Sequence, residues 1–447
     1  MTADLLYSET ERDLAAALAD LLGDRAAPAD VIARTERPET CDAKLWRTVA
    51  AEIGIAGLLI PEALGGAGAS YRELAAAAEQ FGAFAAPIPY LGSAAVATAT
   101  LLAAARSAAA DGDAPGAAAG PAPGAGAGGL EPGDPGGFGS ASSGPAAALR
   151  AAQLRAAARP ATGGAATGTG APTVSPAAGL LRQLADGSLT AALAVTATTR
   201  PGTSFPARAR VSGRGDAPGT VKLRGTIPAV ADALPADVLL VPADGVPSAL
   251  YLVECTAPGV HRTPLVSLDM TRQLCDISLD GAQARQVAVG PAAEAAVAAG
   301  LAAGAAILAA EQLGLAQRCL DLTVAYARER RQFARPIGSF EAVKHRLADL
   351  WTTITLARAA SRYASACLAD GDDDAPVAVA LAKSACCDAA VLAAQECVQL
   401  HGGIGFTWEH PAHLYLKRAK AASAAFGTPG AHRAALADLV NLPAPGA

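Results

Sequence analysis

The chain has 447 residues, of which 52% are hydrophobic, 4% aromatic and 17% charged, and its formal net charge is −6. This apolar fraction excludes a chain that is disordered throughout. The acidic balance, without a stripe of Lys and Arg, argues against a nucleic-acid-binding protein. Eight cysteines spread along so long a chain argue against a disulfide scaffold. The cysteines and the six histidines show no metal-ligand spacing, so we expect no metal.

The N-terminal residues carry no basic stretch before an apolar run, so no targeting segment is predicted. The most apolar stretch, residues 295–310, is shorter than the roughly 20 residues that cross a bilayer. It consists mostly of Ala and Gly and predicts the start of a tightly packed buried helix. We therefore expect a cytoplasmic protein without a membrane contact.

Residues 1–105 are typical of a helical domain, in which Asp42 and Ser70 are expected to cap the starts of two helices. Residues 106–176 are dominated by Ala, Gly, Pro, Ser and Thr. Such a segment cannot bury enough apolar surface to offset the loss of chain entropy. We therefore predict a disordered insertion between two folded parts.

Residues 177–293 contain short runs rich in Val and Leu, separated by Gly, Pro and Asp, and these predict strands. Short strands at this spacing favour a small antiparallel barrel or sandwich.

Residues 294–447 predict long helices. Apolar residues between positions 340 and 354 recur every three or four residues as one buried stripe, to which Trp351 belongs. A later helix is expected to end at Gly402 and Gly403. The order of a helical part, a β part and a second helical part predicts an α+β fold.

Two segments stand out for their chemistry, and the first carries four arginines near a predicted helix end, Arg328, Arg330, Arg331 and Arg335. Guanidinium groups bind phosphate oxygens in pairs, so one interpretation is a diphosphate clamp. The other interpretation is a solvated basic helix end.

The second segment, residues 399–407, follows the later helix. Its paired glycines allow a ligand to approach the backbone closely, and Gln399 can hydrogen-bond to a sugar or base edge. The alternative is an ordinary helix end. The glycines do not follow a strand, so a Rossmann site is not predicted.

Together these segments resemble the acyl-CoA dehydrogenase family. The family pattern is a Tyr, then R-x-(T/Q)-F-G-x-P-I-x-x-F-Q, a helical stretch ending in A-D, an A-K pair, and Q-x-x-G-G-x-G-(F/Y). The matching residues are Tyr326, Arg330, Gln332, Phe333, Pro336, Ile337, Phe340, Ala348-Asp349, Ala382-Lys383 and residues 399–406. The resemblance covers nearly the whole chain except residues 106–176.

The resemblance implies an N-terminal helical domain, a small middle β-barrel or sandwich domain and a C-terminal four-helix bundle. It also implies α,β-dehydrogenation of an acyl-CoA thioester, with an electron-transfer flavoprotein or similar acceptor. The implied cofactor is FAD, held between the β domain and the C-terminal helices across a subunit interface. Carried over, Arg330 and Gln332 would bind the diphosphate with Phe333 nearby, Gln399, Gly402 and Gly403 would meet the neighbouring subunit's cofactor, and Thr428 would contact FAD in its own subunit.

The sequence departs from the family at the catalytic base. The family's usual Glu precedes a Gly-Thr pair, and here that position is Phe426. A minority of the family carries the Glu on the helix before the Arg motif, and here that position is Gly304. No catalytic residue is therefore assigned. Glu311 lies two turns further along the same helix and is either a substitute base or a carboxylate on the helix surface.

The β domain departs as well. The family stretch T-E-P-x-x-G-S-D is present only as residues 196–203, and residues 225–230, expected against the flavin, lack the usual aromatic and hydroxyl. Ala334 also replaces a family Gly. These departures together predict a degenerate flavin site.

Such a sequence is similar to the Glu-less partner in actinobacterial α2β2 acyl-CoA dehydrogenases, in which one subunit type keeps the Glu and the other completes the FAD site across the interface. That resemblance implies a Glu-bearing paralogous subunit and CoA thioesters of steroid side chains, and hence a role in steroid and lipid degradation. Two alternatives stay open. One is a self-sufficient homo-oligomeric flavoenzyme with a different base or reaction, and the other is a flavin-free structural or regulatory subunit.

Overall fold

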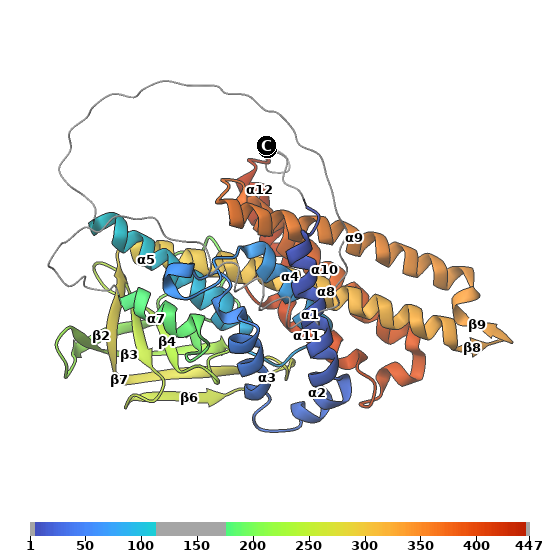
Figure 1. Ribbon diagram of the computed structural model, residues 1–447, viewed down its shortest axis with the longest axis horizontal. Coiled ribbons are helices and arrows are strands. Elements are labelled where there is room, and N and C mark those ends of the chain that lie inside the picture. Colours follow the sequence, from blue (N-terminus) through green and yellow to red (C-terminus); the bar gives the residue numbers. More distant parts are fainter. Residues whose placement is uncertain (1–4, 113–175, 444–447) are drawn as a thin grey trace, which may run out of the picture.

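The computed structural model describes residues 5–112 and 176–443, so most of the predicted insertion lies outside the described residues. The N-terminal part is helical, and Figure 1 shows it beside both the β domain and the C-terminal helices. Its elements are α1 (Glu9–Arg25), α2 (Pro28–Thr35), α3 (Ala43–Arg47), η1 (Thr48–Glu52), η2 (Ile55–Gly57), η3 (Glu62–Leu64), α4 (Tyr71–Ala83), η4 (Leu91–Ala97) and α5 (Thr98–Gly112).

Local capping explains where two of these helices begin. The Ser70 hydroxyl accepts a hydrogen bond from the backbone of Arg72, and the Glu73 carboxylate accepts one from the Ser70 backbone, so α4 starts in a capping box. The Asp42 carboxylate caps α3 by accepting hydrogen bonds from the backbone amides of Lys44 and Leu45. Both predicted helix starts are confirmed. Helix α7 (Pro176–Ala185) packs on α5, although it opens the range expected for the β domain.

The middle part is a small barrel. The strands are β1 (Ala191–Leu193), β2 (Ala209–Arg214), β3 (Thr220–Ala231), β4 (Val238–Asp244), β5 (Ala249–Glu254), β6 (Val260–Pro264) and β7 (Leu274–Val289). Their pairings close a ring in the order β4–β2–β3–β7–β5–β4, with β1 added to β4 and β6 to β7.

The barrel interior follows the period of two expected for strands. Cys275, Ile277 and Leu279 of β7 point into it and are almost completely buried. The expectation of a purely antiparallel arrangement is wrong, because β4 pairs in parallel with both β1 and β2.

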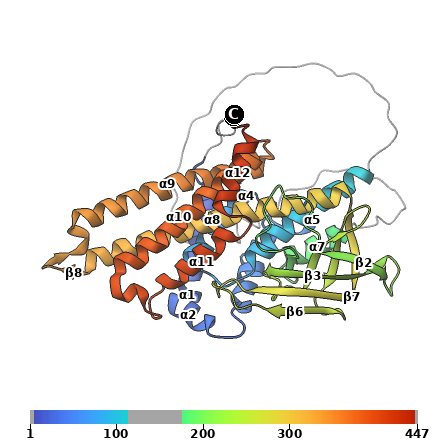
Figure 2. The same cartoon turned by 180° about the vertical axis from the view of Figure 1, so that it is seen from behind.

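The C-terminal part is a helical bundle in which α8, α9, α10 and α11 pack together, with α12 added on α10 (Figure 2). Its elements are α8 (Pro291–Glu329), the hairpin β8 (Arg331–Gln332) and β9 (Arg335–Pro336), η5 (Ile337–Ser339), α9 (Glu341–Asp370), α10 (Ala375–His401), η6 (Gly402–Phe406), α11 (Ala412–Ala424) and α12 (Pro429–Leu439). The helix predicted to end at Gly402 and Gly403 does so.

The stripe predicted on α9 is correct only in part. Leu350 and Ile354, four residues apart, are buried, but Trp351 is 58% exposed. One residue turns a helix by about 100°, so Trp351 lies beside the packed face. Its exposure places a large aromatic ring on the outside of the bundle.

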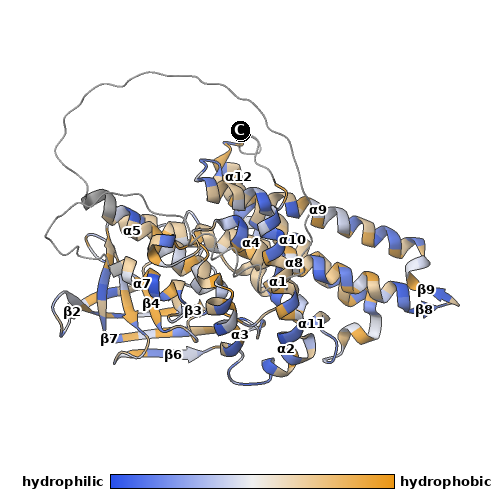
Figure 3. Cartoon of the chain, in the orientation of Figure 1, coloured by the Kyte–Doolittle hydropathy of each residue, from blue (hydrophilic) through white to orange (hydrophobic). Residues whose placement is uncertain are grey.

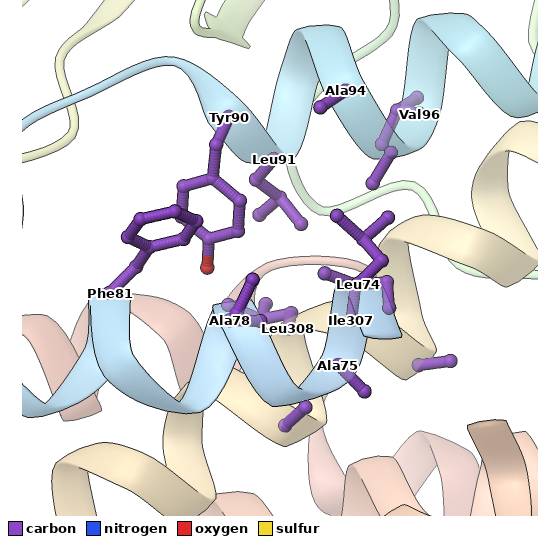
Figure 4. Close-up of a cluster of buried hydrophobic side chains, with 14 of the residues drawn as sticks. Leu74, Ala75, Ala78, Phe81, Tyr90, Leu91, Ala94, Val96, Ile307 and Leu308 are labelled. Carbon is purple, nitrogen blue, oxygen red and sulfur yellow. The ribbon is translucent and has the colours of Figure 1, made fainter. Parts of the chain in front are cut away.

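Helix α8 passes through the middle of the molecule, from the barrel to the β8–β9 hairpin at the opposite end (Figure 1). A Cβ added at Gly82 of α4 would lie 1.9 Å from the Glu311 carbonyl oxygen, and one added at Gly314 would lie 1.8 Å from that of Glu79. The α4 and α8 backbones therefore touch. Beside this contact, Leu74, Phe81, Val96 and Ile307 form an apolar cluster (Figure 4).

Three helical stretches, Leu91–Ala108, Pro291–Glu329 and Ala375–Phe406, are long and apolar enough to cross a membrane by length and composition alone. About two thirds or more of each apolar window is buried inside the protein. The run at residues 295–310 lies in the buried part of α8, as predicted. The apolar residues of these helices therefore serve mainly to pack the fold. At the end of the bundle, the β8–β9 hairpin is largely hydrophilic (Figure 3).

Candidate functional site

The turn between α11 and α12 carries the position where the family's base is expected. The Phe426 amide donates to the Ala197 carbonyl at 2.8 Å, and the His432 side chain donates to the Phe426 carbonyl at 2.8 Å. The buried Lys383 ammonium donates to the Gly427 carbonyl at 3.2 Å. The turn is thus held by the β domain, by α12 and by α10.

The two positions considered for a base lie in direct contact. A Cβ added at Gly304 would come within 2.6 Å of two ring carbons of Phe426 and within 2.9 Å of Val96. Phe426 is only 9% exposed and has a positive φ of 52°. An aromatic ring therefore fills the space over Gly304 that a carboxylate from either position would occupy. Neither residue can accept a proton.

Glu311 is fully buried, so the expectation of a helix-surface carboxylate is wrong. Its carboxylate accepts hydrogen bonds from Arg272 at 2.5 Å and from Arg418 at 2.8 Å. The Tyr90 hydroxyl also donates to it, and Arg418 donates to Thr271 at 2.6 Å. We call Glu311, Arg272, Arg418, Tyr90 and Thr271 the charge cluster.

The charge cluster does not suit proton abstraction. Burial alone would raise the pKa of Glu311, but the charges and hydrogen bonds of Arg272 and Arg418 outweigh it and lower the pKa to about 2. A general base needs a pKa nearer the working pH and access to the substrate. The sequence signal for this burial is that Glu311 is the only charged residue between positions 295 and 317, because a carboxylate buried in such an apolar stretch requires charged partners.

A cleft of about 640 Å³ opens beside the Phe426 turn, between the barrel and the start of α12. The degenerate family stretch, residues 196–203, forms one wall, and Gly427, Thr428 and Ala431 form the other. Arg200 packs closely over the turn, because a Cβ added at Gly427 would lie 2.8 Å from the Arg200 Cβ. Sequence reasoning assigned no role to Arg200 or to Arg208, and both line this cleft.

The other expected cofactor residues gather at the far end of the bundle. Arg330 ends α8, Gln332 and Phe333 belong to the β8–β9 hairpin, and Phe333 is 89% exposed. Gln399, Gly402 and Gly403 end α10 and are exposed as well. The C-terminal ends of α8 and α10 lie side by side, because the Tyr326 ring of α8 stacks on the His401 ring of α10 with centroids 4.5 Å apart. We call Arg330, Gln332, Phe333, Gln399, Gly402 and Gly403 the bundle tip.

Thr428 is separated from the bundle tip within one chain. The turn that carries it contacts Lys383, and Lys383 and Gln399 lie 16 residues apart on α10, about 24 Å at 1.5 Å per residue. The structure thus brings six of the seven expected residues together and leaves Thr428 in the cleft.

Comparisons with known proteins agree with this architecture. The family described as "Acyl-CoA dehydrogenase, N-terminal domain" matches residues 8–113, and the corresponding C-terminal domain matches residues 294–440. The Mycobacterium tuberculosis acyl-CoA dehydrogenase IpdE2 is 31% identical over 411 residues, which cover 92% of this chain and 91% of IpdE2. The chain belongs to the acyl-CoA dehydrogenase family.

Several solved structures are similar to this chain in fold. The ChsE4–ChsE5 complex from Mycobacterium tuberculosis matches with a TM-score of 0.72 and 26% identity, covering 99% of this chain and 100% of the matched chain. A variant of the Tcur3481–Tcur3483 steroid enzyme matches with a TM-score of 0.69 and 26% identity over 97% of this chain and 98% of its own. Butyryl-CoA dehydrogenase from Megasphaera elsdenii shares the fold, with a TM-score of 0.71 at 19% identity, covering 98% of this chain and 100% of that one. The expected α+β fold of the family is confirmed.

Proposed function

We propose that this chain is the Glu-less subunit of a heteromeric FAD-dependent acyl-CoA dehydrogenase, in which a paralogous subunit carries the base. The observation that carries the proposal is the Phe426 ring packed over Gly304, because it removes both carboxylate positions at once. Glu311 cannot replace them, since two arginines and a tyrosine already occupy its oxygens. The active base must then come from another chain.

The bundle tip fits a role in completing a neighbour's FAD site. Arg330 would bind the diphosphate together with Gln332, with the Phe333 ring packed nearby. Gln399, Gly402 and Gly403 would meet the same cofactor. When bound, FAD supplies the hydride-accepting chemistry, and the residues of this chain hold and orient it. All six residues are exposed and therefore accessible to a second chain.

The outer face of the bundle supports an assembly. Several large apolar side chains of the bundle are more than half exposed, and exposed apolar surface marks an interaction site where it is contiguous. They are Phe333, Trp351, Leu356, Phe406 and Trp408. The similar ChsE4–ChsE5 structure is itself a complex of two proteins, which favours an α2β2 assembly with a Glu-bearing partner over a homo-oligomer.

The substrate we propose is an acyl-CoA thioester with a bulky, steroid-derived acyl group. The similarity to a steroid enzyme of this family supports that choice. Reducing equivalents would pass to an electron-transfer flavoprotein or similar acceptor. In this proposal the enzyme acts in the cytoplasm in steroid or lipid degradation.

The test is to purify the full chain alone and co-expressed with a Glu-bearing paralogue, and to measure flavin per assembly by absorbance. We expect flavin only in the complex, with one FAD for each pair of unlike subunits. A flavin-loaded homo-oligomer of this chain with dehydrogenase activity would overturn the proposal.

Arg330→Ala should lower flavin occupancy in the complex without loss of assembly. The matched control is Arg328→Ala, an exposed arginine two residues earlier at the end of α8, which should leave occupancy unchanged. Equal flavin content in wild type and Arg330→Ala would refute the role of the bundle tip.

The filled space over Gly304 also favours a second candidate, a structural or regulatory subunit that binds no flavin. Absence of flavin from a correctly assembled complex would select that candidate.

A further inference from the structure

We propose that Cys397 and Cys319 form a redox site beneath the bundle tip, in which a peroxide oxidises Cys397 and Cys319 then closes a disulfide between α10 and α8. Both cysteines are free thiols in the structure. The site goes beyond the proposed function, because its chemistry requires neither a bound flavin nor a partner chain.

The two cysteines lie on the faces of α8 and α10 that contact each other. Cys319 precedes Tyr326 by seven residues, and Cys397 precedes His401 by four, so each cysteine shares a helix face with one of the two stacked rings. Both side chains are completely buried, and the two thiols hydrogen-bond to each other. A bond between their sulfur atoms would therefore join α8 to α10 without a large movement of either helix.

The His401 side chain offers a hydrogen-bond donor to the Cys397 sulfur. Its Nδ1 lies 2.6 Å from the Cys397 carbonyl oxygen and 3.7 Å from the Cys397 sulfur. Because a carbonyl oxygen can only accept, Nδ1 must carry the hydrogen, and the sulfur shares it. A sulfur that accepts hydrogen bonds from His401 and from the Cys319 thiol is stabilised as a thiolate.

This environment distinguishes Cys397 from the other cysteines. The hydrogen bond from Cys319 lowers the pKa of Cys397 and, together with His401, outweighs the effect of burial, which alone would raise it. For the other seven cysteines, all of which lie within the described ranges, burial raises the pKa. Since the thiolate is the nucleophilic form, we expect Cys397 to react first and Cys319 to serve as the protonated resolving thiol.

The redox site lies close to the protein surface. Gln399 and Gly402, which follow Cys397 at the end of α10, are both exposed. The ring of His410, which packs on the His401 ring with centroids 4.4 Å apart, is half-buried. Helix ends open locally more readily than helix centres, which gives a molecule as small as hydrogen peroxide a route to Cys397.

The reaction balances with one molecule of hydrogen peroxide. The Cys397 thiolate attacks one peroxide oxygen, so that an S–O bond forms, the O–O bond breaks and hydroxide leaves. The Cys319 sulfur then attacks the sulfur of the sulfenic acid, so that the S–S bond forms and the S–O bond breaks. The departing hydroxyl group takes the Cys319 thiol proton and leaves as water. Together the two sulfur atoms lose the two electrons that the peroxide gains.

The test treats the reduced full chain with a small excess of hydrogen peroxide at neutral pH. Peptide mass mapping after denaturation in an alkylating reagent then reports the state of each cysteine. We expect a disulfide between Cys319 and Cys397 that dithiothreitol removes. The control within the same chain is Cys255 and Cys275 of the barrel, where burial raises each pKa to about 11, and which should be oxidised at least about tenfold more slowly.

Substitutions separate the roles of the neighbouring groups. Cys319→Ser should let the peroxide carry Cys397 on to a sulfinic acid, because no resolving thiol remains. His401→Phe keeps an aromatic ring against Tyr326 but removes the N–H, so the oxidation of Cys397 should slow about tenfold. The matched control is His410→Phe, which leaves the Nδ1–H of His401 in place and should be oxidised as the wild type is.

Three results would overturn the proposal. One is a wild-type Cys397 that is oxidised no faster than Cys255 and Cys275. Another is oxidation of Cys397 in the wild type that leaves Cys319 free to be alkylated. The third is a His401→Phe variant that is folded by circular dichroism and is oxidised at the wild-type rate.

Discussion

Helix α8 carries two regions of opposite character two turns apart. At Glu311 a carboxylate is present, fully buried and bound by Arg272 and Arg418. At Gly304 there is no carboxylate, and the ring of Phe426 fills the space. The comparison teaches that a nearby carboxylate does not make a base. The region with the carboxylate has no access to a substrate, and the region next to the cleft has no carboxylate.

The two regions also differ in what they join. The charge cluster links the N-terminal part through Tyr90, the segment before β7 through Arg272, and α11 through Arg418. The Phe426 ring joins the α11–α12 turn to α8 at Gly304, beside Val96 of η4. We therefore expect the first region to control the stability of the whole fold and the second to control the shape of one site.

The largest expected effect is that of removing the charge at Glu311. Glu311→Gln leaves two buried arginines without a counter-charge and should lower the free energy of unfolding by about 3–5 kcal/mol. Urea unfolding at pH 7 measures this. Glu329→Gln, an exposed carboxylate at the end of the same helix, should change it by less than about 0.5 kcal/mol. Similar values for the two variants would show that the charge cluster contributes little.

The pH dependence of stability provides a second test of the charge on Glu311. The folded-state pKa of Glu311 is lowered from 4.5 to about 2, so its contribution is present above about pH 4.5 and is lost as pH falls toward 2. This corresponds to a contribution on the order of 3 kcal/mol. Melting temperatures of wild type and Glu311→Gln should therefore converge between pH 4.5 and 2. A constant difference across that window would contradict a permanently charged Glu311.

A smaller change in stability is expected from substitutions at the contact between Phe426 and Gly304. Gly304→Ala should destabilise the protein by about 1–3 kcal/mol, because the added Cβ would overlap the Phe426 ring. In a Phe426→Ala background the same change should cost little or even stabilise, since Ala favours helix over Gly by up to about 1 kcal/mol. The double-mutant cycle measures the coupling directly. Equal costs in both backgrounds would mean that the ring does not fill this space in solution.

The smallest effect concerns the β8–β9 hairpin, which lies outside both regions. Phe333 and Ala334 both have positive φ, of 52° and 63°, a conformation that favours glycine. Ala334→Gly should therefore raise the free energy of unfolding by about 0.5–1 kcal/mol, measured by thermal melting. Ala348→Gly, at an exposed position within α9, should change it in the opposite direction. A loss of stability from Ala334→Gly would show that the hairpin is not strained at this residue.

Features that depend on neighbouring residues could be predicted from the sequence. The helix cap at Ser70 and the end of α10 at Gly402 are encoded within a few residues, and both were predicted correctly. The parallel pairings of β4 could not be, because strand neighbours are chosen by packing across the whole barrel. The exposed Trp351 was misjudged for a similar reason, since periodicity alone does not reveal which helix covers which face.

The residues of the candidate site likewise divide into those revealed by a local sequence motif and those that only the fold brings together. The motifs of the bundle tip were recognisable because each is contiguous in the sequence. The partners of Glu311 lie at positions 90, 272 and 418 and share no local pattern, so their convergence needed the fold. The Phe426 contact with Gly304 likewise joins residues more than 100 positions apart.

The contact between α4 and α8 has a consequence for motion. The Glu311 carbonyl oxygen of α8 lies where a side chain at Gly82 would stand, and the Glu79 carbonyl oxygen of α4 lies where a side chain at Gly314 would stand. Neither helix can therefore slide or turn against the other without a steric clash. Helices α4 and α8 should then move as one rigid body. Any opening that admits a bulky ligand to the cleft is left to the loop of residues 196–208 and to the barrel that carries it.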